Sequence, residues 1–223
     1  MNALDLFSGI GGFALGFERA GISTAAFCES DPACVAILAK HWPHIPVFGD
    51  VRTLSAEPGF CDVLVGGFPC QPFSTASRGR KTAVDLWPEF HRIARESHPD
   101  WIAAENVPGI GDDGIERVSR DLEAEGYSVW PFDADTALPQ RQRGRHRVIW
   151  LAHANDAIHP RQPLDAEMAR LRDLSGSRWQ NDPAPVGMDD EPAGRMDRFR
   201  QLGNAFTPFF AEVLGKCIVM AST

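Results

Sequence analysis

The chain has 223 residues, of which 43% are hydrophobic, and a formal net charge of −8, enough for one well-filled domain with a small appendage. Its five cysteines are odd in number and form no C-x-x-C pair, which favours reduced thiols over a disulfide framework or a zinc site. No apolar run is long enough to span a bilayer and the N-terminus lacks a signal-peptide pattern, so the sequence predicts a cytoplasmic protein that does not contact membranes.

Strand-like and helix-like segments alternate along most of the chain. The apolar pattern predicts strands at 2–7, 23–30, 61–68 and 100–107, and helices at 12–21, 31–42, 86–97 and 114–126. Two further strands, 127–138 and 147–153, follow one another without an intervening helix, so one of them should run antiparallel. This order predicts an α/β fold with a doubly wound, mostly parallel sheet and helices on both faces.

Composition divides the chain into three parts. Residues 1–154 form the predicted catalytic and cofactor-binding α/β domain. Residues 155–196 are rich in Pro, Asp and Gly and read as a short, irregular arm, too small to bury a core by itself. Residues 197–223 regain an apolar helical pattern, which predicts a C-terminal helix that packs back on the first part.

A glycine-rich turn after the first strand indicates a ligand site. "GIGGFA" fits G-x-G-x-x-G/A through Gly9, Gly11 and Ala14, and Glu29 follows about twenty positions later at the tip of the second strand. The pattern is typical of adenosine-containing ligands, although a dinucleotide site and a plain tight turn share it. Asp5, Glu29 and Asp50, at three neighbouring strand tips, would repel a pyrophosphate and suit the cationic S-adenosylmethionine instead.

The stretch "GGFPCQPFS" places one thiol apart from the others. Cys70 comes just beyond a strand end, between Pro69 and Pro72, where open α/β sheets keep their ligands. This position favours a nucleophile, whereas the other four cysteines, Cys28, Cys34, Cys61 and Cys217, are expected to be packing residues. In "AAENVPG", Glu105 should be a partly desolvated carboxyl of raised pKa that can donate a proton.

Seven blocks of the chain together resemble the DNA (cytosine-5) methyltransferases. They are "DLFSGIGGFALGFERAG", "FCESDP", "GDV", "GGFPCQPFS", "ENVPG", "RGRHRVIWL" and "RQLGNAFTPFFAEVLG", in the family's order and spacing. The resemblance implies a Rossmann-like class I methyltransferase fold and Cys70 as the nucleophile that adds to C6 of a flipped-out cytosine. It also implies that Glu105 holds the cytosine N3 and exocyclic amine, and that Arg145 and Arg147 form the family's basic pair.

The same resemblance implies the other site residues, and it implies no metal site. The cofactor S-adenosylmethionine, which leaves as S-adenosylhomocysteine, would be bound by Asp5, Phe7, Gly9, Gly11, Gly12, Glu29, Ser30, Asp50, Val51, Gly67, Pro69, Leu86 and Asn204. DNA would be contacted by Gln71, Ser74, Arg78, Arg80 and Arg143. The expanded "PQRQRGRHR" block does not fit the family's usual spacing in one frame, so the alignment is anchored on Arg147.

The expected partner is double-stranded DNA, acted on by a monomer. A cognate restriction endonuclease or an accessory specificity subunit is a further candidate partner, because the arm at 155–196 is shorter than the family's usual target-recognition region. Two alternatives stay open: the same chemistry on a tRNA cytosine, and a DNA-binding module or subunit without turnover. Ser74 after Pro-Cys-Gln-Pro-Phe favours DNA over tRNA, and Cys70 with Glu105 favours an enzyme.

Overall fold

A seven-stranded sheet forms the centre of the molecule. The computed structural model describes residues 1–69, 84–135, 146–155 and 206–223. The strands lie in the order β3-β2-β1-β4-β5-β7-β6. Their bounds are β1 Asn2–Leu6, β2 Ser23–Cys28, β3 Val47–Phe48, β4 Val63–Gly67, β5 Trp101–Asn106, β6 Ser128–Asp135 and β7 His146–His153.

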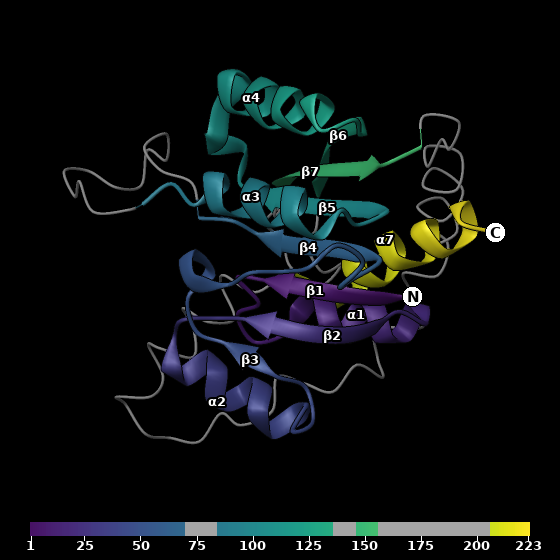
Figure 1. Ribbon diagram of the computed structural model, residues 1–223. Coiled ribbons are helices and arrows are strands. Elements are labelled where there is room, and N and C mark those ends of the chain that lie inside the picture. The colour runs from purple at the N-terminus through teal and green to yellow at the C-terminus, as the bar shows by residue number, and fades with distance from the viewer. Residues whose placement is uncertain (70–83, 136–145, 156–205) are drawn as a thin grey trace.

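The sheet is parallel except for β7. The pairs β1–β2, β1–β4, β2–β3 and β4–β5 are parallel, whereas β7 is antiparallel to both β5 and β6. In Figure 1 the arrows of β1, β2 and β4 point one way and the arrow of β7 points the other. The prediction that one of the last two strands runs antiparallel is therefore confirmed. The parallel strands place their carboxyl ends at one edge of the sheet, where α/β proteins bind ligands.

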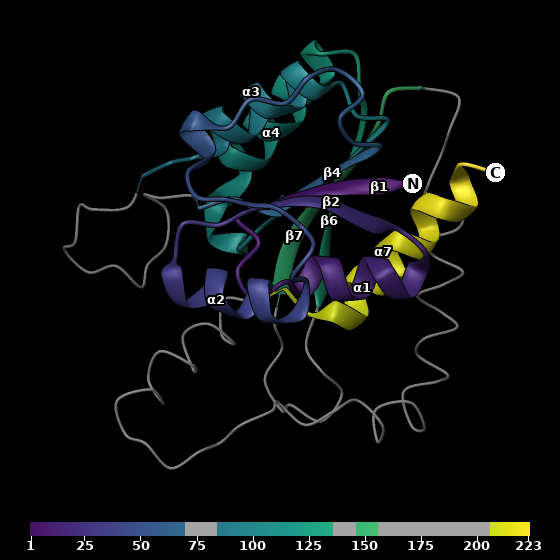
Figure 2. The same cartoon turned by 60° about the horizontal axis from the view of Figure 1, so that its bottom comes forward.

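Helices cover both faces, as the alternation predicted. Helices α3 (Trp87–Ser97) and α4 (Gly111–Ala124) lie on one face, and α1 (Gly12–Ala20), α2 (Pro32–His41) and α7 (Pro208–Ala221) lie on the other (Figure 2). Alternate residues of β1 supply the two cores: Leu4 and Leu6 pack with the α3 side, and Ala3 packs with α1 and α7. This two-sided burial explains why the central strands are mostly apolar.

Local sequence signals set several helix ends. Asp31 caps α2, with its carboxylate accepting a hydrogen bond from the Ala33 backbone N–H at 2.9 Å, and Pro32 occupies the first helical position. Gly21 ends α1 in the left-handed region, as expected for a C-cap glycine. Helix α2 is thereby held with its N-terminus at the ligand-binding edge of the sheet.

Helix α7 returns to α1, although the two are far apart in sequence. A Cβ on Gly16 of α1 would collide with the backbone carbonyl of Pro208 and with Ala211, so the two helices approach closely because Gly16 has no side chain. Helix α7 therefore packs against α1. Within the described ranges, no helix is long and apolar enough to cross a bilayer.

Candidate active site

A cavity of about 370 Å³ lies at the carboxyl ends of β1, β2 and β4. Its volume is in the range of small-molecule sites. It is lined by Phe7, Gly9, Cys28, Glu29, Ser30, Asp31, Cys34, Gly49, Asp50, Val51, Arg52, Gly67, Pro69, Val84 and Leu86. Nine of the predicted cofactor residues therefore share one cavity: Phe7, Gly9, Glu29, Ser30, Asp50, Val51, Gly67, Pro69 and Leu86.

The glycines of the turn after β1 have different roles. Gly9 has a positive φ of 54° and open space where a Cβ would lie, so a ligand can approach its backbone. A Cβ on Gly11 would lie 2.5 Å from the Trp42 ring, and a Cβ on Gly12 would collide with the Phe206 carbonyl oxygen. Neither Gly11 nor Gly12 lines the cavity, and both pack closely against other parts of the chain; their cofactor contact stays a prediction.

Phe7 connects β1 to this turn in an uncommon conformation. Its φ is 54°, a left-handed backbone that non-glycine residues rarely adopt. Such conformations concentrate at functional sites, where the surrounding structure holds them. Ser8 fixes the turn to the neighbouring strand, because its backbone N–H donates to the Cys28 carbonyl at 3.2 Å and its hydroxyl donates to the Asp5 carbonyl at 2.6 Å.

Glu29 joins the glycine turn to the start of α2. Its carboxylate accepts hydrogen bonds from the backbone N–H of Gly9 and from that of Asp31, both at 2.7 Å. Each carboxylate oxygen has a second lone-pair site, so Glu29 can also accept from a ligand hydroxyl. This geometry holds the acid at the place where the fingerprint predicted it.

Asp50 lines the cavity in an ion pair. Its carboxylate accepts from the Arg52 guanidinium at 2.7 Å and from the Arg52 backbone N–H at 3.0 Å, which caps the short helix η1 (Val51–Thr53). The hydrogen bonds to Arg52 lower the pKa of Asp50 to about 2. Asp50 is therefore an ionised acceptor on the cavity wall, and Arg52 beside it was not predicted.

The prediction for Asp5 needs correction. It lies inside β1 rather than at its tip, its exposed fraction is 1%, and it does not line the cavity. Its two carboxyl oxygens have no hydrogen-bond partner within 3.5 Å among the described residues. Burial, followed by the charge of Glu29, raises the pKa of this carboxyl well above its usual value, while the Ala14 backbone N–H opposes the shift. Of the three predicted carboxylates, Glu29 and Asp50 therefore line the cavity and Asp5 does not; the third carboxylate on the wall belongs to Asp31.

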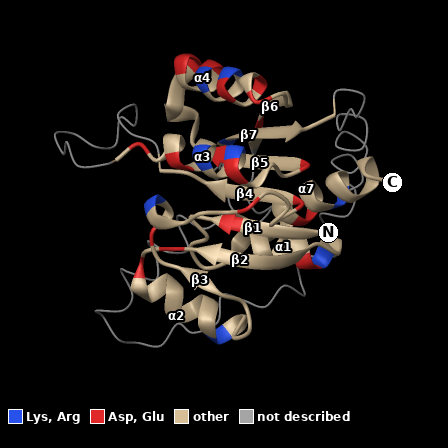
Figure 3. Cartoon of the chain, in the orientation of Figure 1, with Lys and Arg blue, Asp and Glu red and all other residues tan. Residues whose placement is uncertain are grey.

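The negative charge of the cavity wall contributes to the raised pKa of a neighbouring thiol. Burial raises the pKa of Cys28 to about 12, and the charges of Glu29, Asp50 and Asp5 add to the shift. Figure 3 shows acidic segments along the sheet edge where the parallel strands end. A ligand with positive charge and hydrogen-bond donors suits this environment better than a pyrophosphate does.

Glu105 and Arg147, two predicted catalytic residues, form an ion pair. The Arg147 Nε lies 2.5 Å from the Glu105 carboxylate, and each side chain is only 15% exposed. Arg147 is two residues from Ile149, which is directly opposite Glu105 in the antiparallel pair β5–β7, so the two side chains share one face of the sheet. Glu105 is desolvated as expected, and its carboxyl group is paired with the Arg147 guanidinium.

Gly67 leaves the space that the Glu105 carboxyl group occupies. The two residues are partners in the parallel pair β4–β5, and a Cβ on Gly67 would lie 2.5 Å from the Glu105 Oε2. The carboxyl group is thus held between Gly67 of β4 and the Arg147 side chain. Gly67 comes two residues before Pro69 in the chain. The acid, the cavity and the start of the "PCQPFS" segment meet at one place.

Several predicted residues lie outside the described ranges. They are Cys70, Gln71, Ser74, Arg78, Arg80, Arg143, Arg145 and Asn204. The arm at 155–196 also lies outside them, apart from Asn155. The other four cysteines are buried free thiols, as predicted.

Sequence reasoning missed six residues of the cavity wall. They are Cys28, Cys34, Asp31, Gly49, Arg52 and Val84. Cys28 and Cys34 were interpreted as packing residues, and they are buried, but they also face the cavity. For Asp31, Gly49 and Arg52 the signal was their position beside Glu29 and Asp50.

The cavity wall fits S-adenosylmethionine. Glu29 can accept from ribose hydroxyls and Asp50 from an amine, and the partly buried Phe7 and Leu86 offer apolar surface to a ring. The open side of Gly9 leaves room for close approach of a ligand to the backbone. Among the described residues, no group of histidines, cysteines and carboxylates could hold a metal ion.

Comparison with known proteins agrees with the sequence blocks. The family model described as "C-5 cytosine-specific DNA methylase" matches residues 1–183. The Type II methyltransferase M2.BsuMI of Bacillus subtilis (strain 168) is 36% identical over 169 residues, which cover 68% of this chain and 42% of that protein. The Type II methyltransferase M.NgoMIV of Neisseria gonorrhoeae is 37% identical over 167 residues, which cover 70% of this chain and 52% of that protein. The chain thus spans about half of these relatives or less.

A solved structure confirms the fold class. The S. pombe Dnmt2 methyltransferase superposes with a TM-score of 0.56 at 23% identity, over 70% of this chain and 50% of that one. At this identity the likeness concerns the fold alone. Together with the strand order, it confirms the predicted Rossmann-like methyltransferase fold.

Proposed function

The chain belongs to the C-5 cytosine-specific DNA methylase family, as its sequence blocks predicted, and from this we propose that it methylates C5 of cytosine in DNA with S-adenosylmethionine. The observation that carries the proposal is the Glu105–Arg147 ion pair, held against Gly67 beside the cavity that fits the cofactor. A desolvated acid, a cation and an acidic ligand cavity meet where the "PCQPFS" segment begins.

The proposed nucleophile is Cys70. Its thiolate adds to C6 of a cytosine taken out of the duplex, and the electron pair of the C5–C6 double bond moves to C5. C5 takes the electrophilic methyl group that S-adenosylmethionine supplies, and S-adenosylhomocysteine leaves. Loss of the proton from C5 then restores the double bond and expels the Cys70 thiolate, so the enzyme is unchanged after the cycle.

Glu105 and Arg147 are proposed to act on the base. As Cys70 adds, negative charge develops on the ring, and a proton held between Glu105 and the cytosine N3 neutralises it. Arg147 fixes the Glu105 carboxyl group at 2.5 Å and also offers donors for the cytosine O2 or a flanking phosphate. The same ion pair can therefore orient the acid and contact the substrate. Arg145 is proposed as the second member of the basic pair.

The cofactor residues proposed from the cavity wall have separate tasks. Glu29 and Asp50 accept from the adenosine part, and Phe7, Val51 and Leu86 pack against it. Asn204 is proposed to complete this site from the segment that precedes α7. Gly11 and Gly12 are proposed to support it indirectly, by packing.

DNA binding is proposed for two segments that follow Pro69 and precede His146 in the chain. Residues 70–83 contain Arg78, Arg80 and Lys81, and residues 136–145 contain Arg141, Arg143 and Arg145, with no Asp or Glu in either segment. Cationic side chains bind phosphates irrespective of sequence and orient the duplex. Gln71 and Ser74 are proposed as further DNA contacts. Such a protein would act in the cytoplasm as a monomer, beside a restriction endonuclease or with an accessory specificity subunit.

Transfer of a labelled methyl group tests the proposal. The protein and its Cys70→Ser variant are incubated with labelled S-adenosylmethionine and either duplex DNA or tRNA. We expect label at cytosine C5 of DNA with the wild type, no label with the variant, and similar cofactor binding by both. Label in tRNA alone would mean that the substrate is tRNA and not DNA. No label in either nucleic acid, despite cofactor binding, would favour a DNA-binding module without turnover. Equal loss of cofactor binding in the variant would make Cys70 a structural residue.

A further inference from the structure

Asn106, the last residue of β5, has a side chain that joins two strand ends. It follows Glu105 directly and is only 5% exposed. Its Nδ2 donates to the backbone carbonyl of Phe68 at 3.0 Å, and its Oδ1 accepts from the backbone N–H of Val107 at 2.8 Å. One amide group therefore links the chain after β4 to the chain after β5.

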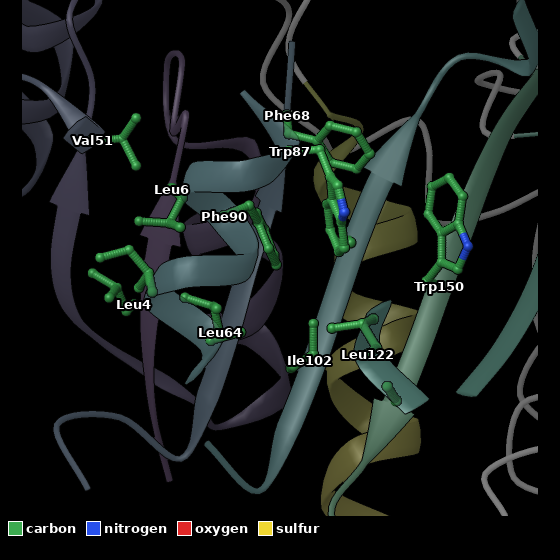
Figure 4. Packing of buried hydrophobic residues seen from close by; sticks show 14 of the residues in the cluster. Leu4, Leu6, Val51, Leu64, Phe68, Trp87, Phe90, Ile102, Leu122 and Trp150 are labelled. Atoms are coloured by element: carbon green, nitrogen blue, oxygen red, sulfur yellow. The ribbon is translucent and has the colours of Figure 1, made fainter. Parts of the chain in front are cut away.

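Phe68 is held at its ring as well as at its carbonyl. The ring is buried in an aromatic cluster, with centroids 5.0 Å from Trp87 and 6.0 Å from Trp150 (Figure 4). The next carbonyl, that of Pro69, accepts from the Leu86 backbone N–H at 3.1 Å. Both carbonyls that precede Cys70 are thus fixed by hydrogen bonds from other parts of the chain.

We infer that Asn106 is a positioning residue that sets the place of the Cys70-bearing segment relative to the Glu105 carboxyl group. The inference rests on the proposed function of these two residues. Asn106 is next to Glu105 in the chain and bonds to the backbone two residues before Cys70, so its side chain links the two. Because the ring of Pro69 fixes φ, the direction in which the chain enters residue 70 depends on how the Phe68 peptide is held.

The two bonds of Asn106 require an amide. A carboxylate has no N–H donor for the Phe68 carbonyl, and an alanine has neither donor nor acceptor. Displacement of reacting groups by about 1 Å can reduce a rate by about 100-fold. A change at Asn106 should therefore affect the chemical step more than cofactor affinity.

The experiment compares Asn106→Ala and Asn106→Asp with the wild type. Asp keeps an acceptor for the Val107 N–H and loses only the donor, so the pair separates the two bonds. In single-turnover assays at saturating cofactor and DNA, we expect both variants to transfer methyl about 100-fold more slowly, with cofactor Kd changed less than about threefold. Ser97→Ala is the matched control, because it removes another buried hydrogen bond, to Ile93, within α3. It should keep the wild-type rate.

Amide exchange of Leu86 gives a second readout that needs no activity. If Asn106 holds the segment, its loss should speed exchange of the Leu86 N–H, the donor to Pro69, by about tenfold or more. The inference would be overturned, and the proposed function would stand, if both Asn106 variants transferred methyl at the wild-type rate. The same holds if the transfer rate and the cofactor affinity fell in proportion. If the wild type itself transferred no methyl group, the proposed function would fail. In that case the exchange measurement alone tests the inference, and an unchanged exchange rate of the Leu86 N–H in the Asn106 variants would overturn it.

Discussion

Replacing Gly67 by alanine tests how tightly the Glu105 carboxyl group is held. The added Cβ would lie 2.5 Å from Oε2 and 3.6 Å from Cδ of Glu105, where ordinary van der Waals contact begins at about 3.4 Å. The carboxyl oxygen must therefore move by about 0.9 Å away from β4, which changes the geometry of its ion pair with Arg147. The φ of Gly67 is not in the left-handed region, so alanine should not strain the backbone.

A shift of this size should slow methyl transfer by about 100-fold, equivalent to about 2.7 kcal/mol in the barrier. The assay is single-turnover transfer to duplex DNA at saturating cofactor, because Gly67 also lines the cavity. Gly49→Ala is the matched control: it lines the same cavity, and its Cβ would enter open space. The control should transfer at nearly the wild-type rate once the cofactor saturates.

The double variant with Glu105→Gln tests the route of the effect. If Gly67→Ala acts through Glu105, adding it to Glu105→Gln should slow transfer little further, because the displaced acid is already absent. A wild-type rate for Gly67→Ala alone would refute the reasoning, since the carboxyl position would then not matter. Fully additive losses would instead locate the effect elsewhere in the cavity.

Three further outcomes are expected. Burial raises the pKa of Asp5, so the stability that its bound proton gives the folded state is complete below the unfolded pKa of about 3.8 and is lost as pH rises toward the folded-state pKa. Asp5→Asn should therefore raise Tm over the wild type more at pH 8 than at pH 5. An equal rise in Tm at both pH values would contradict this. Burial raises the pKa of Cys28 to about 12 and of Cys61 to about 11, so iodoacetamide at pH 8 should modify both thiols only after the protein unfolds. Mass spectrometry of the alkylated protein measures this, and modification of the folded protein would count against the burial of these thiols. Gly16→Ala should push α7 off α1 at the Pro208 carbonyl and destabilise by about 2 kcal/mol, seen as a Tm lower by about 4–8 °C; an unchanged Tm would mean that α7 docks more loosely.

The sequence determined the elements and the chemistry carried by local signals. The apolar periodicity predicted the described helices and the alternation of strands, because burial on one or two faces imposes a period on the chain. Gly21 and Asp31 marked helix ends, since left-handed backbone and a free helix N-terminus each favour few residue types. Glu29 and Asp50 were predicted for the ligand site from their place after strands, and both line the cavity.

Tertiary structure decided what depends on neighbours distant in sequence. Glu105 meets Arg147 because β7 inserts antiparallel beside β5, and no local pattern specifies that strand order. Gly11 and Gly12 have packing roles because Trp42 and Phe206 come from other segments. The burial of Asp5 likewise results from the helices that cover its strand. Local signals fix which residues have the required chemistry, whereas pairing and burial are set by long-range packing, which fixes where those residues meet.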